Sequence, residues 1–198
     1  MPRFSDTEKE MIREKLLREG ERLFVAHGVK KVTVDDLVQA AGIAKGSFYA
    51  FYTNKEHLYM DIIEQCQMKL WQELDDFLAD HKDLRPQELT KRSFGRMLEG
   101  VKEYPILVKT DSAVMSYLQR KLPQDVLDAH GFEDSKALVK LQEYGVRFAY
   151  ELPVVAKALQ ALYVAIAYLQ QEEADHAVVV NLLLDSLIER IVRASHDD

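Results

Sequence analysis

Residues 33–49 read Thr-Val-Asp-Asp-Leu-Val-Gln-Ala-Ala-Gly-Ile-Ala-Lys-Gly-Ser-Phe-Tyr, and this stretch decides the expected fold. Thr33 is a candidate N-cap, and the two acids that follow it suit the positive end of a helix dipole. Gly42 ends that helix and opens a tight turn, after which a short third helix is expected from about Lys45 to Tyr52. Two short helices joined by a glycine turn and braced by a longer first helix form a helix-turn-helix.

Four aromatic residues crowd the third helix, although the helical period lets only about two of them face inward. We expect Phe48 to pack inside together with Phe51 or Tyr52, which leaves Tyr49 pointing outward. An exposed tyrosine beside Lys, Gly and Ser suits a surface that contacts phosphates and base edges. The same stretch is therefore expected both to build a core and to meet DNA.

The flanking sequence predicts more helices. Ser5 or Asp6 can cap a first helix that ends at Gly28, and Asn54 can cap a long helix over 55–80. Further helices are expected over 86–103, 107–122, part of 123–133, a Ser135-capped segment carrying Leu138, Leu141, Tyr144, Val146 and Phe148, and a hairpin of 153–171 and 174–194. The whole chain is predicted to be all-α, in keeping with only 8 Gly and 5 Pro.

Composition excludes several classes of protein. Of the 198 residues, 47% are apolar and 30% charged, which indicates neither disorder nor a membrane protein. The first ten residues lack the apolar segment of a secretory signal. One cysteine, Cys66, allows no internal disulfide and fits a reducing cytoplasm, where a buried structural thiol is favoured over a redox sensor.

Charge is distributed unevenly along the chain. Its formal net charge is −7, yet residues 1–60 carry ten Lys/Arg against nine Asp/Glu, and the excess of acids lies beyond them. The N-terminal part is thus the segment without net repulsion from phosphate. No Gly-rich phosphate loop, nucleophile elbow or metal-ligand spacing appears, so we expect no enzyme, no cofactor and no metal site.

The quoted stretch, followed by Asn-Lys-Glu-His-Leu at 54–58 and preceded by Phe24-x-x-x-Gly28, closely resembles the tetracycline-repressor (TetR) family of transcriptional regulators. The resemblance covers about residues 10–60. It implies a DNA-binding domain over 1–54, with the helix-turn-helix proper at about 33–52. It also implies a helical effector-binding and dimerisation domain over 55–198.

The resemblance assigns DNA-contacting roles to individual residues. Two positions depart from the family pattern: Ala50 stands where a polar residue is frequent and Phe51 where His is common, so Ala50 is free to touch a thymine methyl. Taken singly, Lys45, Ser47 and Lys55 also suit ordinary solvated surface. The implied contacts are Thr33, Ala44, Lys45, Gly46, Ser47, Tyr49, Ala50 and Lys55.

The last two helices are apolar around too much of their circumference to be satisfied by one neighbour. Such pairs assemble about a two-fold axis into a four-helix bundle, so we expect a homodimer through about 153–194; the centre of a monomeric bundle is the alternative. A dimer with recognition helices about 34–36 Å apart would match a palindromic operator.

The resemblance further implies an effector pocket between the middle helices, for an apolar or amphipathic small molecule. The same large residues equally suit plain core. They are Trp71, Phe94, Met97, Met115, Tyr117, Phe148 and Tyr163. The expected function is a cytoplasmic, ligand-released transcriptional repressor. The alternative is a helical binding or catalytic protein that keeps the helix-turn-helix as scaffold.

Overall fold

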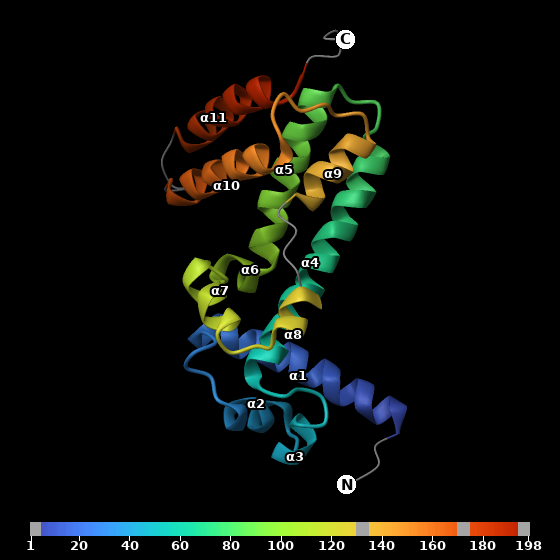
Figure 1. Cartoon of the computed structure of the whole chain (residues 1–198), viewed down its shortest axis with the longest axis vertical. Helices are drawn as coiled ribbons and strands as arrows, with labels where there is room; N and C mark the ends of the chain where they lie inside the picture. The colour runs from blue at the N-terminus through green and yellow to red at the C-terminus, as the bar shows by residue number, and fades with distance from the viewer. Residues whose placement is uncertain (1–4, 130–134, 170–174, 194–198) are drawn as a thin grey trace. The chain divides into compact units, whose positions relative to one another are not determined.

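The computed structural model describes residues 5–129, 135–169 and 175–193, and these residues form helices with one isolated β-bridge (Figure 1). The helices are α1 (Asp6–His27), α2 (Val34–Ala41), α3 (Lys45–Phe48), α4 (Lys55–Asp80), α5 (Pro86–Glu103), α6 (Pro105–Lys109), α7 (Ser112–Gln119), α8 (Gln124–Ala129), α9 (Lys136–Glu143), α10 (Leu152–Tyr168) and α11 (His176–Ile191). The all-α prediction is confirmed.

The chain packs as two compact units. The first comprises Met1–Lys69 with Val101–Gly131, and the second comprises Leu70–Gly100 with Phe132–Asp198. Helices α4 and α5 each contribute residues to both. This division follows packing, whereas the functional boundary after residue 54 stays a prediction.

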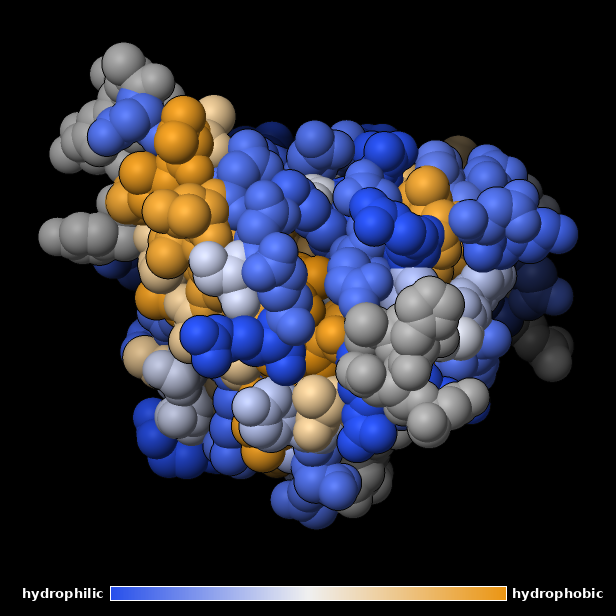
Figure 2. Space-filling model, turned by 90° about the horizontal axis from the view of Figure 1, so that it is seen from above, coloured by the Kyte–Doolittle hydropathy of each residue, from blue (hydrophilic) through white to orange (hydrophobic). Residues whose placement is uncertain are grey.

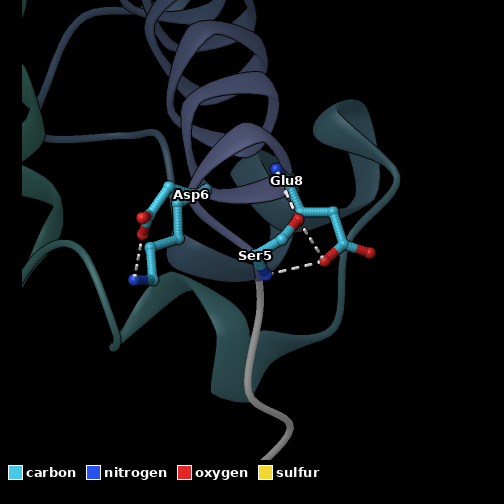
Figure 3. A network of polar contacts seen from close by, with 4 residues as sticks. Ser5, Asp6 and Glu8 are labelled. Atoms are coloured by element: carbon cyan, nitrogen blue, oxygen red, sulfur yellow. Dashed lines mark hydrogen bonds and ion pairs between the residues drawn. The ribbon is translucent and has the colours of Figure 1, made fainter.

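The start of α1 is fixed by a capping box (Figure 3). Ser5 Oγ accepts a hydrogen bond from the backbone N–H of Glu8, and Glu8 Oε2 accepts one from the backbone N–H of Ser5 at 2.8 Å. Asp6 forms an ion pair with Lys9 one turn on, at 2.9 Å. The expected Ser5 cap is confirmed, and it satisfies donors that the first turn of a helix otherwise leaves unpaired.

The core of the first unit is built from α1, α2, α3, the first half of α4, α6 and α7. Leu16, Phe24 and Leu37 are fully buried in it. α1 approaches α4 closely at Gly20, where an added Cβ would lie 3.0 Å from Ile62 Cδ1. A side chain at position 20 would therefore require the side chains of Ile62 and Leu58 to shift by a few tenths of an ångström.

The prediction of a single helix over 107–122 is wrong, because the chain forms two helices there, α6 and α7. Thr110 ends α6, and its hydroxyl donates to the carbonyl of Ile106 at 2.7 Å. Asp111 then caps α7 by accepting a hydrogen bond from the N–H of Val114 at 2.8 Å. Two adjacent side chains thus satisfy backbone groups locally and interrupt the helix.

The core of the second unit gathers α4 after residue 70, α5 and α9–α11. It contains Leu74, Leu78, Leu89, Leu138, Leu141, Val146, Phe148, Val155, Leu162, Leu184, Ile188, Ile191 and Val192. The predicted helix through Val146 and Phe148 is too long, because α9 ends at Glu143 and Gly145 adopts φ 85°. Phe148 instead forms an antiparallel β-bridge with Val192.

The predicted terminal hairpin is confirmed as α10 and α11, which pack against each other. Its polar turn at 170–173 lies outside the described residues. No helix within the described ranges is both long and apolar enough to cross a membrane. Cys66 is buried in the first unit, with its thiol 3.8 Å from Glu21 Oε1.

Candidate DNA-binding surface

Helix α2 begins at a second capping box. Thr33 Oγ1 accepts a hydrogen bond from the N–H of Asp36 at 3.2 Å, and Asp36 Oδ2 accepts from both the N–H and the hydroxyl of Thr33, at 2.8 and 2.7 Å. The Thr33 hydroxyl holds the pKa of the Asp36 carboxyl below its usual value, so this carboxylate stays ionised near the positive end of α2. The expected Thr33 cap is confirmed.

The turn between α2 and α3 depends on Gly42. Its φ of 66° and ψ of 38° place it in the left-handed region, which only glycine adopts without strain. Its N–H donates to the carbonyl of Gln39, and the N–H of Ile43 donates to that of Val38 at 3.0 Å. These bonds close the tight turn predicted from the sequence.

Helix α3 is shorter than the predicted 45–52. It ends at Phe48 because Ala50 and Phe51 donate in tighter turns to the carbonyls three residues back. Phe48 is fully buried and Tyr52 is 4% exposed, whereas Tyr49 is 54% exposed. The predicted division between inward and outward aromatics is confirmed, with Tyr52 more deeply buried than Phe51.

The residues predicted to touch DNA gather around α2, α3 and the start of α4, within the first unit. Thr33, Ala44, Lys45, Gly46, Tyr49 and Ala50 are exposed, and Ser47 and Lys55 are half-buried. Figure 1 shows α2 and α3 side by side, and α1 packs against α2. Contact of these residues with DNA stays a prediction, but the fold presents them at one surface.

Several predicted contacts already have partners within the chain. Lys45 Nζ lies 2.8 Å from Asp35 Oδ1, and the Thr33 hydroxyl is occupied by Asp36. Lys55 Nζ donates to the carbonyls of Val32 and Lys30, at 2.6 and 3.1 Å. Lys55 therefore fastens the loop that precedes α2 to the start of α4, a structural role that the sequence did not indicate.

A partly buried polar network lies behind α3. Asp61 accepts the Tyr52 hydroxyl at 2.6 Å, and Arg13 Nη2 lies 3.0 Å from each of its oxygens. Burial, and next the hydrogen bond to Asp61, raise the pKa of Tyr52 well above its usual value. Tyr52, Asp61 and Arg13 thus tie the segment after α3 to α4 and α1. In the sequence, Asp61 lies 9 residues from Tyr52 and 48 residues from Arg13, so no local motif indicated this network.

The predicted effector residues are divided between the two units. Met115 and Tyr117 pack against the first core, and Tyr117 donates to Glu56 at 2.5 Å. Phe148 lies in the second core and Tyr163 is half-buried on α10. Trp71, Phe94 and Met97 pack against the second core. Within the described residues, no group of three or more His, Cys, Asp or Glu is placed to hold a metal ion.

Comparison with known proteins agrees with this geometry. Residues 16–62 match the family model of bacterial regulatory proteins, tetR family. The chain is 21% identical, over 196 residues, to the uncharacterized HTH-type transcriptional regulator YerO of Bacillus subtilis, a match covering 92% of this chain and 66% of YerO. It is 31% identical over 65 residues to the HTH-type transcriptional repressor AcnR of Corynebacterium diphtheriae, covering 33% and 34% of the two chains. These matches span less than two thirds of either relative.

A solved structure shares the fold across nearly the whole chain. SmeT, the repressor of the Stenotrophomonas maltophilia multidrug efflux pump SmeDEF, aligns with a TM-score of 0.61 at 24% identity, covering 92% of this chain and 91% of SmeT. The capped α2, the Gly42 turn and the exposed α3 therefore form a helix-turn-helix within the segment that matches the family model of tetR-type bacterial regulatory proteins. Over residues 16–62, this helix-turn-helix segment belongs to the TetR family.

Proposed function

We propose that this regulator is a homodimeric repressor that binds a palindromic operator in the cytoplasm and is released by a small-molecule effector. The observation that carries the proposal is α3, whose Phe48 is fully buried while its neighbour Tyr49 is 54% exposed. A short helix anchored on one side and open on the other suits insertion into a major groove.

The proposed DNA contacts differ in what they offer. A Cβ added at Gly46 would meet no other side chain or neighbouring element within 4 Å, so its backbone is open to close approach. Tyr49 and Lys45 offer hydrogen-bond donors, and Ala44 and Ala50 offer methyl groups that can meet thymine. Thr33, Ser47 and Lys55 would position the phosphate backbone, with Lys55 contributing a backbone N–H in the first turn of α4.

Dimerisation is supported by apolar surface on α10 and α11. Figure 2 shows hydrophobic side chains gathered at one edge of the view. The exposed large apolar residues of α10 and α11 are Val154, Val164, Val178, Leu182 and Leu183, at 53%, 61%, 68%, 65% and 38% exposure. A helix pair with this much apolar surface suits a two-fold interface with a second copy. The described part of the proposed interface is 153–169 and 175–193.

The effector is proposed to be apolar or amphipathic. Trp71, Phe94 and Met97 are partly buried around the second core, and Tyr163 presents a hydroxyl whose pKa is raised by burial. Large apolar side chains with few polar groups suit ligands of this kind. Met115 and Tyr117 belong to the first unit, so their proposed part in effector binding rests on the family resemblance alone.

The test is binding of purified protein to the DNA upstream of its own gene, from about 50 to 200 mM salt, where loss of affinity reports phosphate contacts. Tyr49→Ala is expected to weaken binding at least tenfold. Tyr150→Ala is the matched control because Tyr150, 56% exposed in the second unit, loses a similar surface ring. The double variant Tyr49→Ala/Lys55→Ala should lose specific binding; circular dichroism checks its fold because Lys55 also holds a loop.

The outcomes separate two functions. Absence of binding by the wild-type protein at low salt would favour a helical protein that keeps the helix-turn-helix only as scaffold. Equal affinity of Tyr49→Ala and wild type would reject the assigned surface. Transcription from the bound promoter, measured with and without the regulator, distinguishes repression from activation.

A further inference from the structure

Two oppositely charged residues meet at the edge of the proposed DNA-binding surface. Lys45 begins α3 and Asp35 lies in the first turn of α2. The Lys45 ammonium is 2.8 Å from Asp35 Oδ1 and 3.0 Å from Oδ2, so it bridges both carboxylate oxygens. Their side chains are 53% and 71% exposed, which leaves the pair in reach of an approaching duplex.

The pair changes what Lys45 can contribute to DNA binding. A free lysine that neutralises a phosphate releases a condensed counterion, which strengthens binding to any sequence and steepens its salt dependence. A lysine that is already paired with a carboxylate releases no counterion when a phosphate approaches. The other acid of this turn, Asp36, is occupied by the Thr33 cap, and Asp35 is the one that faces Lys45.

We infer that Asp35 is a specificity-determining residue, which withholds the Lys45 ammonium from backbone phosphates and so weakens binding to non-operator DNA. The inference rests on the proposed function and adds to it a residue that lowers affinity for DNA other than the operator. Non-operator binding is almost wholly electrostatic, so it loses the full phosphate contact. At the operator, base contacts fix the register and Lys45 can meet a base edge instead, so less is lost.

Asp35→Asn tests the inference, because asparagine keeps the shape and removes the charge. Affinity is measured from about 50 to 300 mM salt for a random-sequence duplex and for a duplex that the wild type selects from a random pool. For the random duplex, the slope of log affinity against log salt should steepen by about 0.9 per half-site and affinity at 0.1 M salt should rise at least about threefold. Affinity for the selected duplex should rise less.

Lys45→Ala supplies the decisive comparison. Because the gain requires the freed ammonium, Asp35→Asn should change neither slope nor affinity in a Lys45→Ala background. Glu14→Gln, which removes one charge from an exposed position of α1, is the control for net charge and should leave the slope unchanged.

Three results overturn the inference. One is an unchanged slope in Asp35→Asn, and another is an equal gain for both duplexes. The third is a gain that persists in Lys45→Ala or appears in Glu14→Gln, since Asp35 would then act only through overall charge. Failure of the wild type to select any duplex would instead contradict the proposed function, and the inference with it.

Discussion

The phenolic hydroxyl of Tyr117 donates a hydrogen bond to Glu56 Oε1 at 2.5 Å and so joins α7 to the first turn of α4. Glu56 is only 6% exposed, and the Lys30 ammonium lies 5.4 Å from the centre of the Tyr117 ring. Tyr117 therefore contacts both α4 and the loop that leads into α2. A residue of the later helices is part of the packing that supports the helix-turn-helix.

Tyr117→Phe should lower the free energy of unfolding by about 1.5–3 kcal/mol, because the buried Glu56 carboxylate loses a hydrogen-bond donor. Urea denaturation followed by circular dichroism measures the change. Tyr150→Phe removes the same hydroxyl from an exposed position and should stay within about 0.5 kcal/mol of wild type. Equal stability of Tyr117→Phe and wild type would show that the bond contributes nothing.

The same hydroxyl should make stability sensitive to alkali. Burial, and next the bond to Glu56, raise the pKa of Tyr117 to about 12 from 10.0. The folded state thus favours the neutral phenol, and this stabilisation is fully present below pH 10 and lost as the pH rises to about 12. The stability difference between wild type and Tyr117→Phe should therefore shrink between about pH 10 and 12. A constant difference across this range contradicts the assignment.

Gly42 and Gly46 should respond oppositely to alanine. Gly42→Ala forces a Cβ into the left-handed region and should cost about 1–2 kcal/mol of stability. Gly46 is helical with open space around it, so Gly46→Ala should leave stability unchanged or raise it by up to about 1 kcal/mol. Gly46→Ala should nonetheless bind DNA more weakly, because the methyl group occupies the approach to the backbone. Thermal unfolding and DNA titration together separate the two effects.

The Arg13–Asp61–Tyr52 network should be more important for stability than surface charge. Asp61→Asn removes the charge that Arg13 and the Tyr52 hydroxyl bind, and should cost about 1.5–3 kcal/mol. Asp83→Asn makes the same exchange at an exposed residue and should be near neutral. Chemical denaturation of both variants measures the difference. Equal effects would show that the network contributes no more to stability than an ion pair on the surface.

Leu182→Glu should abolish the proposed dimer, since it places a charge on a side chain that is 65% exposed in one copy. Size-exclusion chromatography with light scattering is expected to give about the mass of one chain, against two for wild type. Gln142→Glu on α9 adds the same charge to another exposed position and should leave the dimer intact. A monomeric wild type would reject the interface outright.

Much of the helical order was predictable because its signals are local. Asn54 accepts a hydrogen bond from the N–H of His57 and Pro86 opens α5, so the bounds of α4 and α5 follow from nearby residues. The segment after Glu143 was not predictable. There Ala149 donates to the carbonyl of Ile191 at 2.8 Å, and apolar periodicity within residues 135–148 carries no information about a partner so far along the chain.

The exposure of the DNA-binding surface was predictable, whereas its internal contacts were not. Helical period alone places Phe48 inward and Tyr49 outward. The bond from Lys55 to Lys30 crosses 25 residues, and Lys45 reaches Asp35 across the Gly42 turn. Such contacts depend on the angles and distances at which the helices cross. A local sequence pattern does not determine these, so the contacts became visible only in the structure.

The bonds from Lys55 to the carbonyls of Val32 and Lys30 have a consequence for building hybrid regulators. Transplanting only residues 1–54 onto another body would leave behind the lysine that holds the loop before α2. The donor segment should instead carry residues 55–69 and 101–131 as well, because these complete the same compact unit. In this chain, the compact unit that contains the helix-turn-helix is discontinuous in sequence, and a hybrid regulator should be designed around that unit.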